Sequence, residues 1–444
     1  MNPLLKNRHF LSLTGNGVMA VFSLLTYLIL YRFLAAADMG NWIFFQFVFL
    51  LLDTFRTGLL QTALIKFYAG ADELRKRRVA GSAWYISLLI TGIFVVLNVA
   101  AWPFASWVRD AGVLVTLQWF GLSLAVTLPY NVAIWLLQAE QRFDRILYIR
   151  LLNQGSFIVL VFGLYLLHRV GLQGVINSFL LSSLLTSVVA VAAGWARLRA
   201  LPHKAAAEVR ELFHFGKYSF GTFLCANLFR SSDAFIVKFM LGPAALAIYN
   251  LPTRLLEIIE IPLRSGLATA MPSMSAAVNQ HREAEVVAIL RKYTVLLTLL
   301  FVPLIAGTLL FADVIVGLIG GGKYVGTEAA NIYRIMMLCS ILFPLERFLG
   351  VTLDIINKPQ LNLVKVILAL GVNVVADVLF IKALGNVYGA ALASVCTLVA
   401  STAYGYVALR RYLPLTFRGA LGVGLLELKA GSTGLFHKMK LLRL

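Results

Sequence analysis

A long apolar segment decides the fold class of this chain: residues 293–318 read Tyr293-Thr-Val-Leu-Leu-Thr-Leu-Leu-Phe-Val-Pro-Leu-Ile-Ala-Gly-Thr-Leu-Leu-Phe-Ala-Asp-Val-Ile-Val-Gly-Leu318. About 20 apolar residues in a helix, rising about 1.5 Å per residue, cross a hydrocarbon layer about 30 Å thick. The segment does not alternate apolar and polar side chains, as the strands of a membrane barrel do. The sequence therefore predicts a membrane-spanning helix here.

Comparable segments recur along the whole chain. Of its 444 residues, 60% are hydrophobic and only 13% are charged, which lies outside the usual composition of a soluble globular domain. The predicted fold class is an all-α polytopic membrane protein with about twelve transmembrane helices. The predicted helices are residues 11–34, 42–64, 82–105, 113–138, 146–167, 172–195, 216–240, 246–272, 293–318, 328–350, 361–381 and 388–409.

The basic residues indicate how these helices are oriented. The formal net charge is +19, and lysine and arginine accumulate in alternate connections, as they do in cytoplasmic loops. The basic side carries Lys6, Arg8, Arg75, Lys76, Arg77, Arg78, Arg142, Arg145, Arg197, Arg199, Lys204, Arg210, Arg282, Arg291, Lys292, Lys358 and the tail from Arg410. Both termini are therefore expected in the cytoplasm. The charge reflects topology and attraction to anionic lipid, and nucleic acid is not an expected partner.

No metal, redox or nucleotide chemistry is expected. Cys225, Cys339 and Cys396 lie inside apolar segments, as small hydrophobic side chains do. The six histidines have no metal-ligand spacing. Gly317-Leu-Ile-Gly-Gly-Gly-Lys-Tyr324 is one residue from a phosphate-binding loop, but it ends in tyrosine where Ser or Thr would bind magnesium. The sequence therefore predicts no metal site and no cofactor.

The two halves of the chain resemble each other. Gly171-Leu-Gln-Gly174 opens the sixth predicted helix much as Gly385-Asn-Val-Tyr-Gly389 opens the twelfth. Six helices per half is an even number, so two six-helix bundles are expected to run parallel, related by an axis along the membrane normal. The predicted divisions are 1–200 and 201–411 for the bundles and 412–444 for a basic cytoplasmic tail. A substrate site is expected between the bundles.

Charged side chains inside two of the predicted helices form closely spaced pairs. Each such group costs at least about 2.5–3.5 kcal/mol at bilayer depth, so each needs a partner or a watery cavity. Asp53 and Arg56 lie three residues apart, and so do Arg230 and Asp233, which places each pair on one helix face. Each pair is either a structural ion pair or part of substrate or ion handling, and the sequence leaves both readings open.

The eighth predicted helix carries a longer charged stripe. Arg254, Glu257, Glu260 and Arg264 advance by three, three and four residues and so lie within about 120° of one another around the helix. Such a stripe needs an aqueous lumen or a facing polar stripe, and the lumen is favoured. The tenth helix adds Arg334 within its span.

Three further charged residues lie in the second half. Glu346 and Arg347 fall near the cytoplasmic end of the tenth predicted helix, where long side chains snorkel to the interface. Asp377 is a lone carboxylate in the eleventh helix and is expected to pair with a neighbouring helix. None of the three is predicted to contact a substrate.

Several motifs resemble a known family. They are Leu34-Ala-Ala-Ala-Asp-Met-Gly-Asn-Trp42, the segment Asp53–Phe67, Glu211-Leu-Phe-His-Phe-Gly216, Ser232-Asp-Ala-Phe-Ile-Val237 and Leu241-Gly-Pro-Ala-Ala-Leu-Ala-Ile-Tyr249. Together they are similar to the polysaccharide flippases of the multidrug/oligosaccharidyl-lipid/polysaccharide exporter superfamily. The resemblance covers residues 10–410. One departure is that many members add two more helices, whereas this tail is basic.

The resemblance implies a transporter and not an enzyme. It implies a V-shaped pair of bundles like that of MATE transporters, alternating access, and an undecaprenyl-pyrophosphate-linked oligosaccharide as cargo. The setting implied is polysaccharide, lipopolysaccharide O-antigen or exopolysaccharide biosynthesis at a bacterial inner membrane. Membrane lipid is an expected partner, and polysaccharide polymerase and glycosyltransferases are candidate partners. Related flippases have arginines on the second and eighth helices, which here are Arg56 and Arg254.

The intramembrane charges are thus assigned two roles. The planar fork of arginine suits the oxygens of a pyrophosphate better than the point charge of lysine. The candidate cationic, substrate-binding residues are Arg56, Arg230, Arg254, Arg264 and Arg334. The candidate counter-charges or ion-coupling residues are Asp53, Asp233, Glu257 and Glu260.

Two alternatives stay open. One is a cation-coupled multidrug exporter of the same superfamily, although clustered arginines would repel cationic drugs. The other is a membrane-embedded polysaccharide polymerase or glycosyltransferase, although the predicted outer connections are too short for a catalytic loop. The sequence alone does not identify the sugar or the coupling ion.

Overall fold

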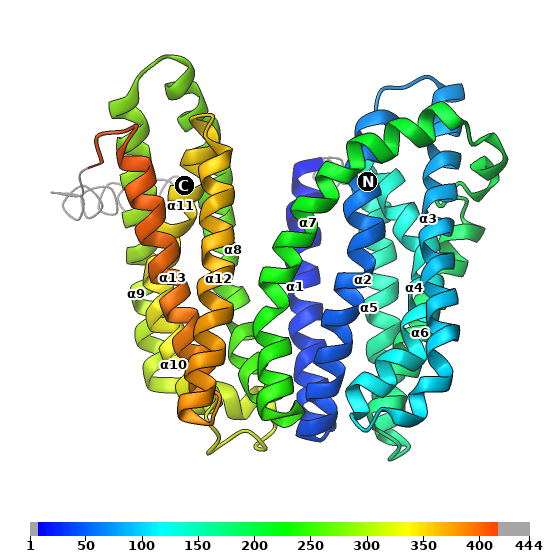
Figure 1. Cartoon of the computed structure of the whole chain (residues 1–444), viewed down its shortest axis with the longest axis horizontal. Helices are drawn as coiled ribbons and strands as arrows, with labels where there is room; N and C mark the ends of the chain where they lie inside the picture. Colours follow the sequence, from blue (N-terminus) through cyan, green and yellow to red (C-terminus); the bar gives the residue numbers. More distant parts are fainter. Residues whose placement is uncertain (1–7, 416–444) are drawn as a thin grey trace, which may run out of the picture. The chain divides into compact units, whose positions relative to one another are not determined.

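The computed structural model describes residues 8–415, with side chains from residue 17 onward, and its regular elements in that range are all helices (Figure 1). A chain in lipid must satisfy its backbone N–H and C=O groups internally, which helices do. The α-helices are α1 (Arg8–Phe33), α2 (Ala36–Tyr68), α3 (Glu73–Ala101), α4 (Ala111–Ala139), α5 (Phe143–Leu166), α6 (Leu172–Ala192), α7 (Ala206–Leu241), α8 (Pro243–Asn279), α9 (Glu283–Gly320), α10 (Ala329–Cys339), α11 (Phe343–Ile355), α12 (Pro359–Leu384) and α13 (Tyr388–Arg410).

Each of the twelve predicted segments overlaps an observed helix, but the tenth, residues 328–350, is divided in two. A 3₁₀ turn, Ser340–Leu342, separates α10 from α11. Pro344, at the start of α11, has no N–H to donate to the carbonyl of Ser340, so the α-helical hydrogen-bond ladder is interrupted there. The predicted segment is therefore a single apolar span, Ala329–Ile355, that contains a 3₁₀ turn.

The helices fit a multi-pass membrane protein. Within residues 8–415, nine segments are long and apolar enough to cross a membrane, and Ala329–Ile355 counts as one of them. Residues Gly17–Phe33 of α1 form a shorter apolar helix. The two remaining predicted spans correspond to α7 and α8. These helices carry several of the charged candidate site residues, which lower their hydropathy. The count of twelve spans stays a prediction.

Internal contacts divide the chain into two compact units. Unit 1 comprises residues 1–238 and 242–247, and unit 2 comprises residues 239–241 and 248–444. In unit 1, α4 packs against α2, α3 and α6, and α5 packs against α1 and α6. Its core includes Trp84 and Trp135, both buried. The indole N–H of Trp84 donates to the Ala196 carbonyl at 2.7 Å, which satisfies its polar atom.

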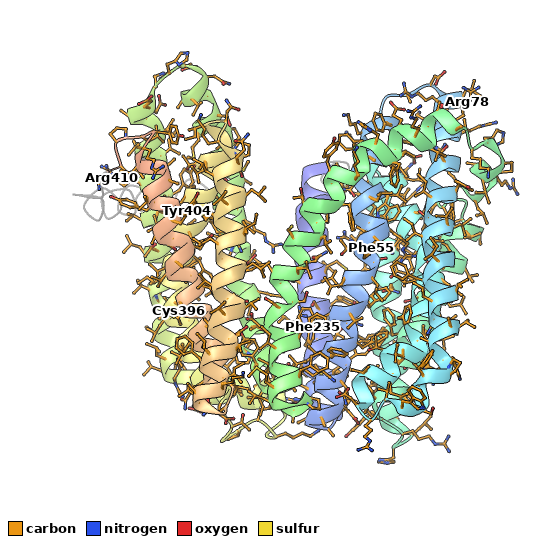
Figure 2. All side chains as sticks on the ribbon, in the orientation of Figure 1. Phe55, Arg78, Phe235, Cys396, Tyr404 and Arg410 are labelled. Carbon is orange, nitrogen blue, oxygen red and sulfur yellow. The ribbon has the colours of Figure 1, made fainter. Side chains whose placement is uncertain are left out.

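Helix α7 belongs to unit 1 as far as Lys238 and packs closely on α2. A Cβ added at Gly216 would lie 2.1 Å from the Leu59 carbonyl oxygen, so only glycine permits this approach. The rings of Phe55 and Phe220 have centroids 4.9 Å apart, and the Phe235 ring contacts that of Phe44 on α2. Figure 2 labels Phe55 on α2 and Phe235 on α7. The observed units therefore divide near residues 239–247, whereas the sequence predicts a division between residues 200 and 201.

Unit 2 contains an antiparallel pair, α12 and α13, which packs against α10 and α11. Helix α9 contacts α10 and α11. The turn between α12 and α13 uses the second glycine motif of the sequence. Gly385 ends α12 in the left-handed region, at φ +68°. A Cβ at Gly389 would lie 2.6 Å from the backbone nitrogen of Ile381, so this glycine permits close packing of the two helices.

Candidate functional site

The first charged cluster lies in unit 1 and centres on Arg56, which is fully buried. Its Nε donates to Asp53 Oδ1 at 3.0 Å, as the spacing of three residues on α2 predicts. Its terminal nitrogens donate to Thr91 Oγ1 at 3.3 Å, to Thr127 Oγ1 at 3.0 Å and to the Leu124 carbonyl. Arg56 therefore ties α2 to α3 and α4.

The burial of Arg56 bears on its predicted role in substrate binding. Its guanidinium is hydrogen-bonded on every nitrogen, and Asp53 also accepts a bond from Thr57 Oγ1 at 2.7 Å. Asp53 retains some exposure, with 17% of its side chain accessible. In this conformation the arrangement is that of an ion pair within α2 whose arginine also binds α3 and α4, and contact of Arg56 with cargo stays a prediction. Farther along unit 1, Arg230 lies exposed on α7, with Asp233 partly exposed one turn away.

The second charged cluster lies on α8, in unit 2. Arg254 donates to Glu257 Oε1 at 2.7 Å and approaches Asn250 Oδ1 at 3.4 Å. One turn further, Glu260 Oε2 accepts two bonds from Arg264, at 3.1 and 2.8 Å. The predicted stripe is thus present as two adjacent arginine–carboxylate pairs on one helix.

A third arginine reaches this stripe from α11. Arg347 donates to Glu260 Oε1 at 3.1 Å, so both oxygens of Glu260 are held by arginine. The Nε of Arg347 also lies 3.8 Å from Glu346 Oε2. Glu346 Oε1 in turn accepts from Lys365 Nζ on α12 at 2.7 Å and from Ser401 Oγ on α13 at 3.1 Å. We call Arg264, Glu260, Arg347, Glu346 and Lys365 the charge network.

The charge network alternates in sign and runs from the surface of unit 2 to its interior. The exposed fractions of the side chains are 76% for Arg264, 27% for Glu260, 52% for Arg347, 16% for Glu346 and 5% for Lys365. Its outer arginines can meet an anion, and its inner members cannot. Glu346 does not snorkel to an interface as the sequence suggested, because a lysine from α12 holds it inside the unit.

Arg334 takes part in a separate cluster between α9 and α10. It donates to Asn331 Oδ1 at 2.7 Å, to the Leu309 carbonyl at 3.2 Å and to the carboxylate of Asp313. These contacts all lie within unit 2. The structure does not bring Arg334 into the charge network, and its contact with cargo stays a prediction.

Three charged residues that form ion pairs in the structure were not among the candidate site residues predicted from the sequence: Lys365, Asp313 and Lys238. Lys365 and Asp313 are single charged residues in apolar segments. The sequence could have indicated them, because a lone charge inside the membrane is costly and needs a partner, as was argued for Asp377. Lys238, in unit 1, has a fully buried side chain that donates to Asp110 and lies 4.2 Å from the centre of the Phe44 ring. Nothing in the local sequence links it to Asp110.

Asp110 is also the N-cap of α4, where its Oδ1 accepts from the backbone N–H of Val113 at 2.8 Å. Partial burial raises the pKa of the Asp110 carboxyl, but the bonds from Lys238 and Val113 outweigh burial and lower the pKa below its usual value. A Cβ at Gly112 would lie 2.9 Å from Lys238 Cε, so glycine leaves room for the lysine.

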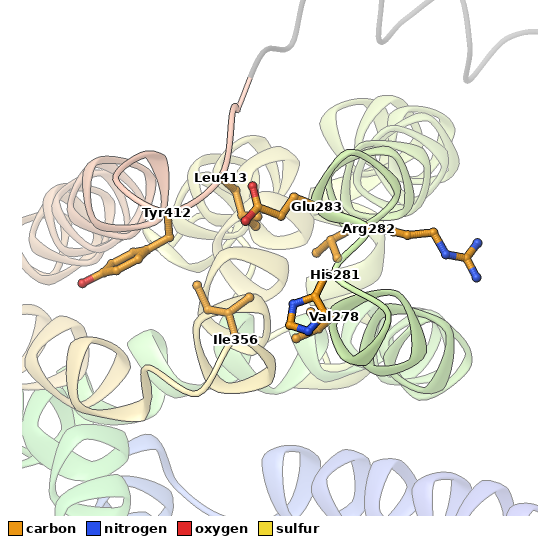
Figure 3. Close-up of a pocket in the computed structure, with 8 residues that line it drawn as sticks. Val278, His281, Arg282, Glu283, Ile356, Tyr412 and Leu413 are labelled. Carbon is orange, nitrogen blue, oxygen red and sulfur yellow. The ribbon is translucent and has the colours of Figure 1, made fainter.

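A small cavity of about 210 Å³ opens elsewhere in unit 2, where α8 ends and α9 begins (Figure 3). Its lining includes His281, Glu283 and Tyr412 among apolar side chains. Arg282 points away from the other labelled residues in Figure 3 and pairs with Glu285 at 2.8 Å. Within the described residues, no three His, Cys, Asp or Glu side chains are grouped so that they could hold a metal ion.

The fold defines the class of protein. The chain is similar to the lipid II flippase MurJ in its inward closed conformation, with a TM-score of 0.74 and 14% identity over 93% of this chain and 89% of that one. It is also similar to an inward-facing multidrug resistance MATE family transporter of the MOP superfamily, with a TM-score of 0.73 and 16% identity over 88% and 94%. The chain therefore has the fold of multi-pass membrane transporters.

The family is established by the sequence match. Residues 29–328, more than half of the chain, match the family described as "Polysaccharide biosynthesis protein", and the chain belongs to that family. The chain is also 24% identical over 284 residues to the probable low-salt glycan biosynthesis flippase Agl15 of Haloferax volcanii. That match covers 63% of this chain and spans 58% of the length of the relative. The relatives named here are two flippases and a multidrug resistance transporter.

Proposed function

We propose that this protein is a flippase that moves a lipid-pyrophosphate-linked oligosaccharide, carried on undecaprenol, across the bacterial inner membrane by alternating access. The observation that carries the proposal is the outer part of the charge network, where Arg264 and Arg347 share the Glu260 carboxylate. Both arginines are more than half exposed. Family membership and the named relatives support polysaccharide biosynthesis as the setting.

The chemistry of the cargo matches this arrangement. A pyrophosphate carries several negative oxygens, and a guanidinium binds two of them at once through parallel N–H donors. Glu260 occupies the position that a phosphate would take between Arg264 and Arg347. Arg254 and its partner Glu257 lie on the same helix and provide a second such pair. Cargo binding then consists of exchanging an internal carboxylate for an external phosphate.

The exchange also assigns a role to the carboxylates. Glu257 and Glu260, and in unit 1 Asp53 and Asp233, balance the arginines while cargo is absent. A carboxylate released by cargo takes up a proton or sodium ion, and cargo and cation favour opposite-facing states, each shifting the equilibrium only by its own difference in affinity. Translocation in sealed vesicles with the gradient collapsed should then be slower, and a Glu260→Gln variant should be less sensitive to the gradient. Equal rates for both proteins under both conditions would contradict this coupling.

No covalent step is assigned to the protein. Glycosyltransferases supply the lipid-linked oligosaccharide on the cytoplasmic side, and a polysaccharide polymerase consumes it on the other side. The protein contributes binding and conformational change, with both of its termini in the cytoplasm.

Translocation in proteoliposomes tests the proposal, using a fluorescent lipid-pyrophosphate-linked oligosaccharide as cargo. We expect Arg254→Ala and Arg264→Ala to slow translocation by roughly tenfold or more, since a charge-assisted bond contributes about 1.5–3 kcal/mol. Arg282→Ala is the matched control: this arginine precedes α9 and also pairs with a glutamate three residues further on, but it lies outside the charge network. If the native protein moves a cationic drug and no lipid-linked sugar, the protein is a drug exporter and the proposal is wrong.

A further inference from the structure

We infer that Lys365 is a positioning residue for cargo binding: by holding the Glu346 carboxylate, it keeps the neighbouring Arg347 guanidinium available to the phosphate. The inference rests on the proposed function, because it treats Arg347 as a cargo contact. Lys365 itself is 5% exposed and does not reach the cargo. Its effect is carried through Glu346, which lies between the two cations.

The hydrogen bonds of Glu346 are divided unequally between its neighbours. Oε1 accepts from Lys365 Nζ at 2.7 Å and from Ser401 Oγ at 3.1 Å. Oε2 lies 3.8 Å from Arg347 Nε, beyond the usual range of a hydrogen bond. Arg347 instead donates to Glu260 at 3.1 Å. Glu346 is therefore committed to the lysine, and Arg347 remains directed to the outer part of the charge network.

The surrounding helices make room for this lysine. A Cβ at Gly350 on α11 would lie 2.8 Å from Lys365 Nζ, and a Cβ at Gly405 on α13 would lie 3.3 Å from its Cδ. Lys365 Nζ also donates to the Glu346 carbonyl at 3.2 Å. A buried ion pair is weak evidence for stability, because desolvation offsets much of the attraction. Stability alone therefore does not explain why a lysine is buried here between Gly350 and Gly405.

Removal of the lysine changes which cation Glu346 meets. Without Lys365, the nearest cation to Glu346 is Arg347, whose Nε lies 3.8 Å away. Carboxylate and guanidinium form strong paired hydrogen bonds when they are free to do so. Arg347 would then turn from Glu260 to Glu346 and be lost to the cargo. If Glu346 is neutralised as well, nothing captures Arg347 and cargo binding returns.

Binding of farnesyl pyrophosphate to the purified full chain in detergent tests this inference, with farnesol as the uncharged control. We expect Lys365→Met to weaken binding roughly tenfold, the loss of about one charge-assisted contact. The double variant Lys365→Met/Glu346→Gln should bind within about twofold of native. In an Arg347→Ala background, Lys365→Met should cause no further loss, because the two changes act through one group. Thermal unfolding of every variant identifies those that fail to fold, and Lys365→Gln replaces Lys365→Met if needed.

Four outcomes would overturn the inference. A double variant as weak as Lys365→Met would show that Lys365 only supports the packing of α11–α13. Equal weakening by Lys365→Met with and without Arg347 would show a general effect of charge. Native-like binding by Arg347→Ala, with weakened binding by Arg264→Ala, would remove Arg347 from the site and leave the proposed function standing. Failure of the native protein to prefer farnesyl pyrophosphate over farnesol would instead refute the proposed function, and this inference with it.

Discussion

Replacing Arg56 with alanine should destabilise unit 1, whereas replacing Arg264 should not destabilise unit 2. Both arginines pair with a carboxylate on their own helix, but Arg56 is fully buried and Arg264 is 76% exposed. Arg56→Ala removes three interhelical hydrogen bonds, each contributing about 0.6 kcal/mol in membrane proteins. It also leaves Asp53 without its cation, at a further cost of about 2.5–3.5 kcal/mol at bilayer depth.

The sum is a loss of about 4–5 kcal/mol, of which the unpaired carboxylate is the larger part. On the scale of domains of 150–250 residues this lowers the unfolding midpoint by about 10 °C. Tryptophan fluorescence during heating in detergent measures it, with Arg264→Ala as the control expected within about 0.5 kcal/mol of native. Asp53→Asn in the Arg56→Ala background should restore part of the loss. A native-like midpoint for Arg56→Ala, or no recovery in the double variant, would refute the assignment of Arg56 as a structural ion-pair partner.

Other parts of the molecule give three more predictions. Gly216→Ala should destabilise the protein by about 1–3 kcal/mol through overpacking against Leu59, while Gly221→Ala on the same helix, which meets no atom within 4 Å, should not; equal unfolding midpoints would contradict the close α2–α7 contact. Because the pKa of Asp110 is lowered in the folded protein, its stabilisation is present above the ordinary value of about 3.9 and is lost as pH falls through the lowered value. Native thermal stability should therefore fall more steeply below about pH 4 than that of Asp110→Asn, and parallel curves would show that the pair with Lys238 contributes nothing. Reporter fusions should place residue Arg78 in the cytoplasm and Lys323 on the opposite side, and the reverse result at either site would overturn the orientation derived from the basic loops.

The sequence predicted helix positions well because hydropathy is a local property. Each predicted segment overlaps an observed helix. The tenth segment contains a 3₁₀ turn at Ser340–Leu342, where Pro344 interrupts the α-helical hydrogen bonding. The close approach of α7 to α2 at Gly216 was less predictable. It joins residues far apart in the chain, so no local pattern reveals it.

Part of the candidate site could also be predicted. The pairs Asp53–Arg56, Arg254–Glu257 and Glu260–Arg264 are set by helical spacing, and each forms as that spacing indicates. The sequence could not show which pairs are enclosed, because burial depends on neighbouring helices. The contacts of Arg347 with Glu260 and of Lys365 with Glu346 join different helices. The spacing of residues within one helix could not predict them.

The alternation of charge explains how an anion site can persist in a membrane protein without its cargo. Arginines alone at bilayer depth would repel one another and be poorly solvated, so an empty site of bare cations would be unstable. The charge network holds three cations and two carboxylates, which leaves one net positive charge when it is empty. In the proposed cycle, a phosphate that replaces Glu260 would find two arginines already oriented, and the inner pair of Glu346 and Lys365 would stay in place because it is bound within the unit. In this proposal the inner pair would fix the geometry while the outer carboxylate is exchanged, and this separation would let one site bind a highly charged lipid and still release it.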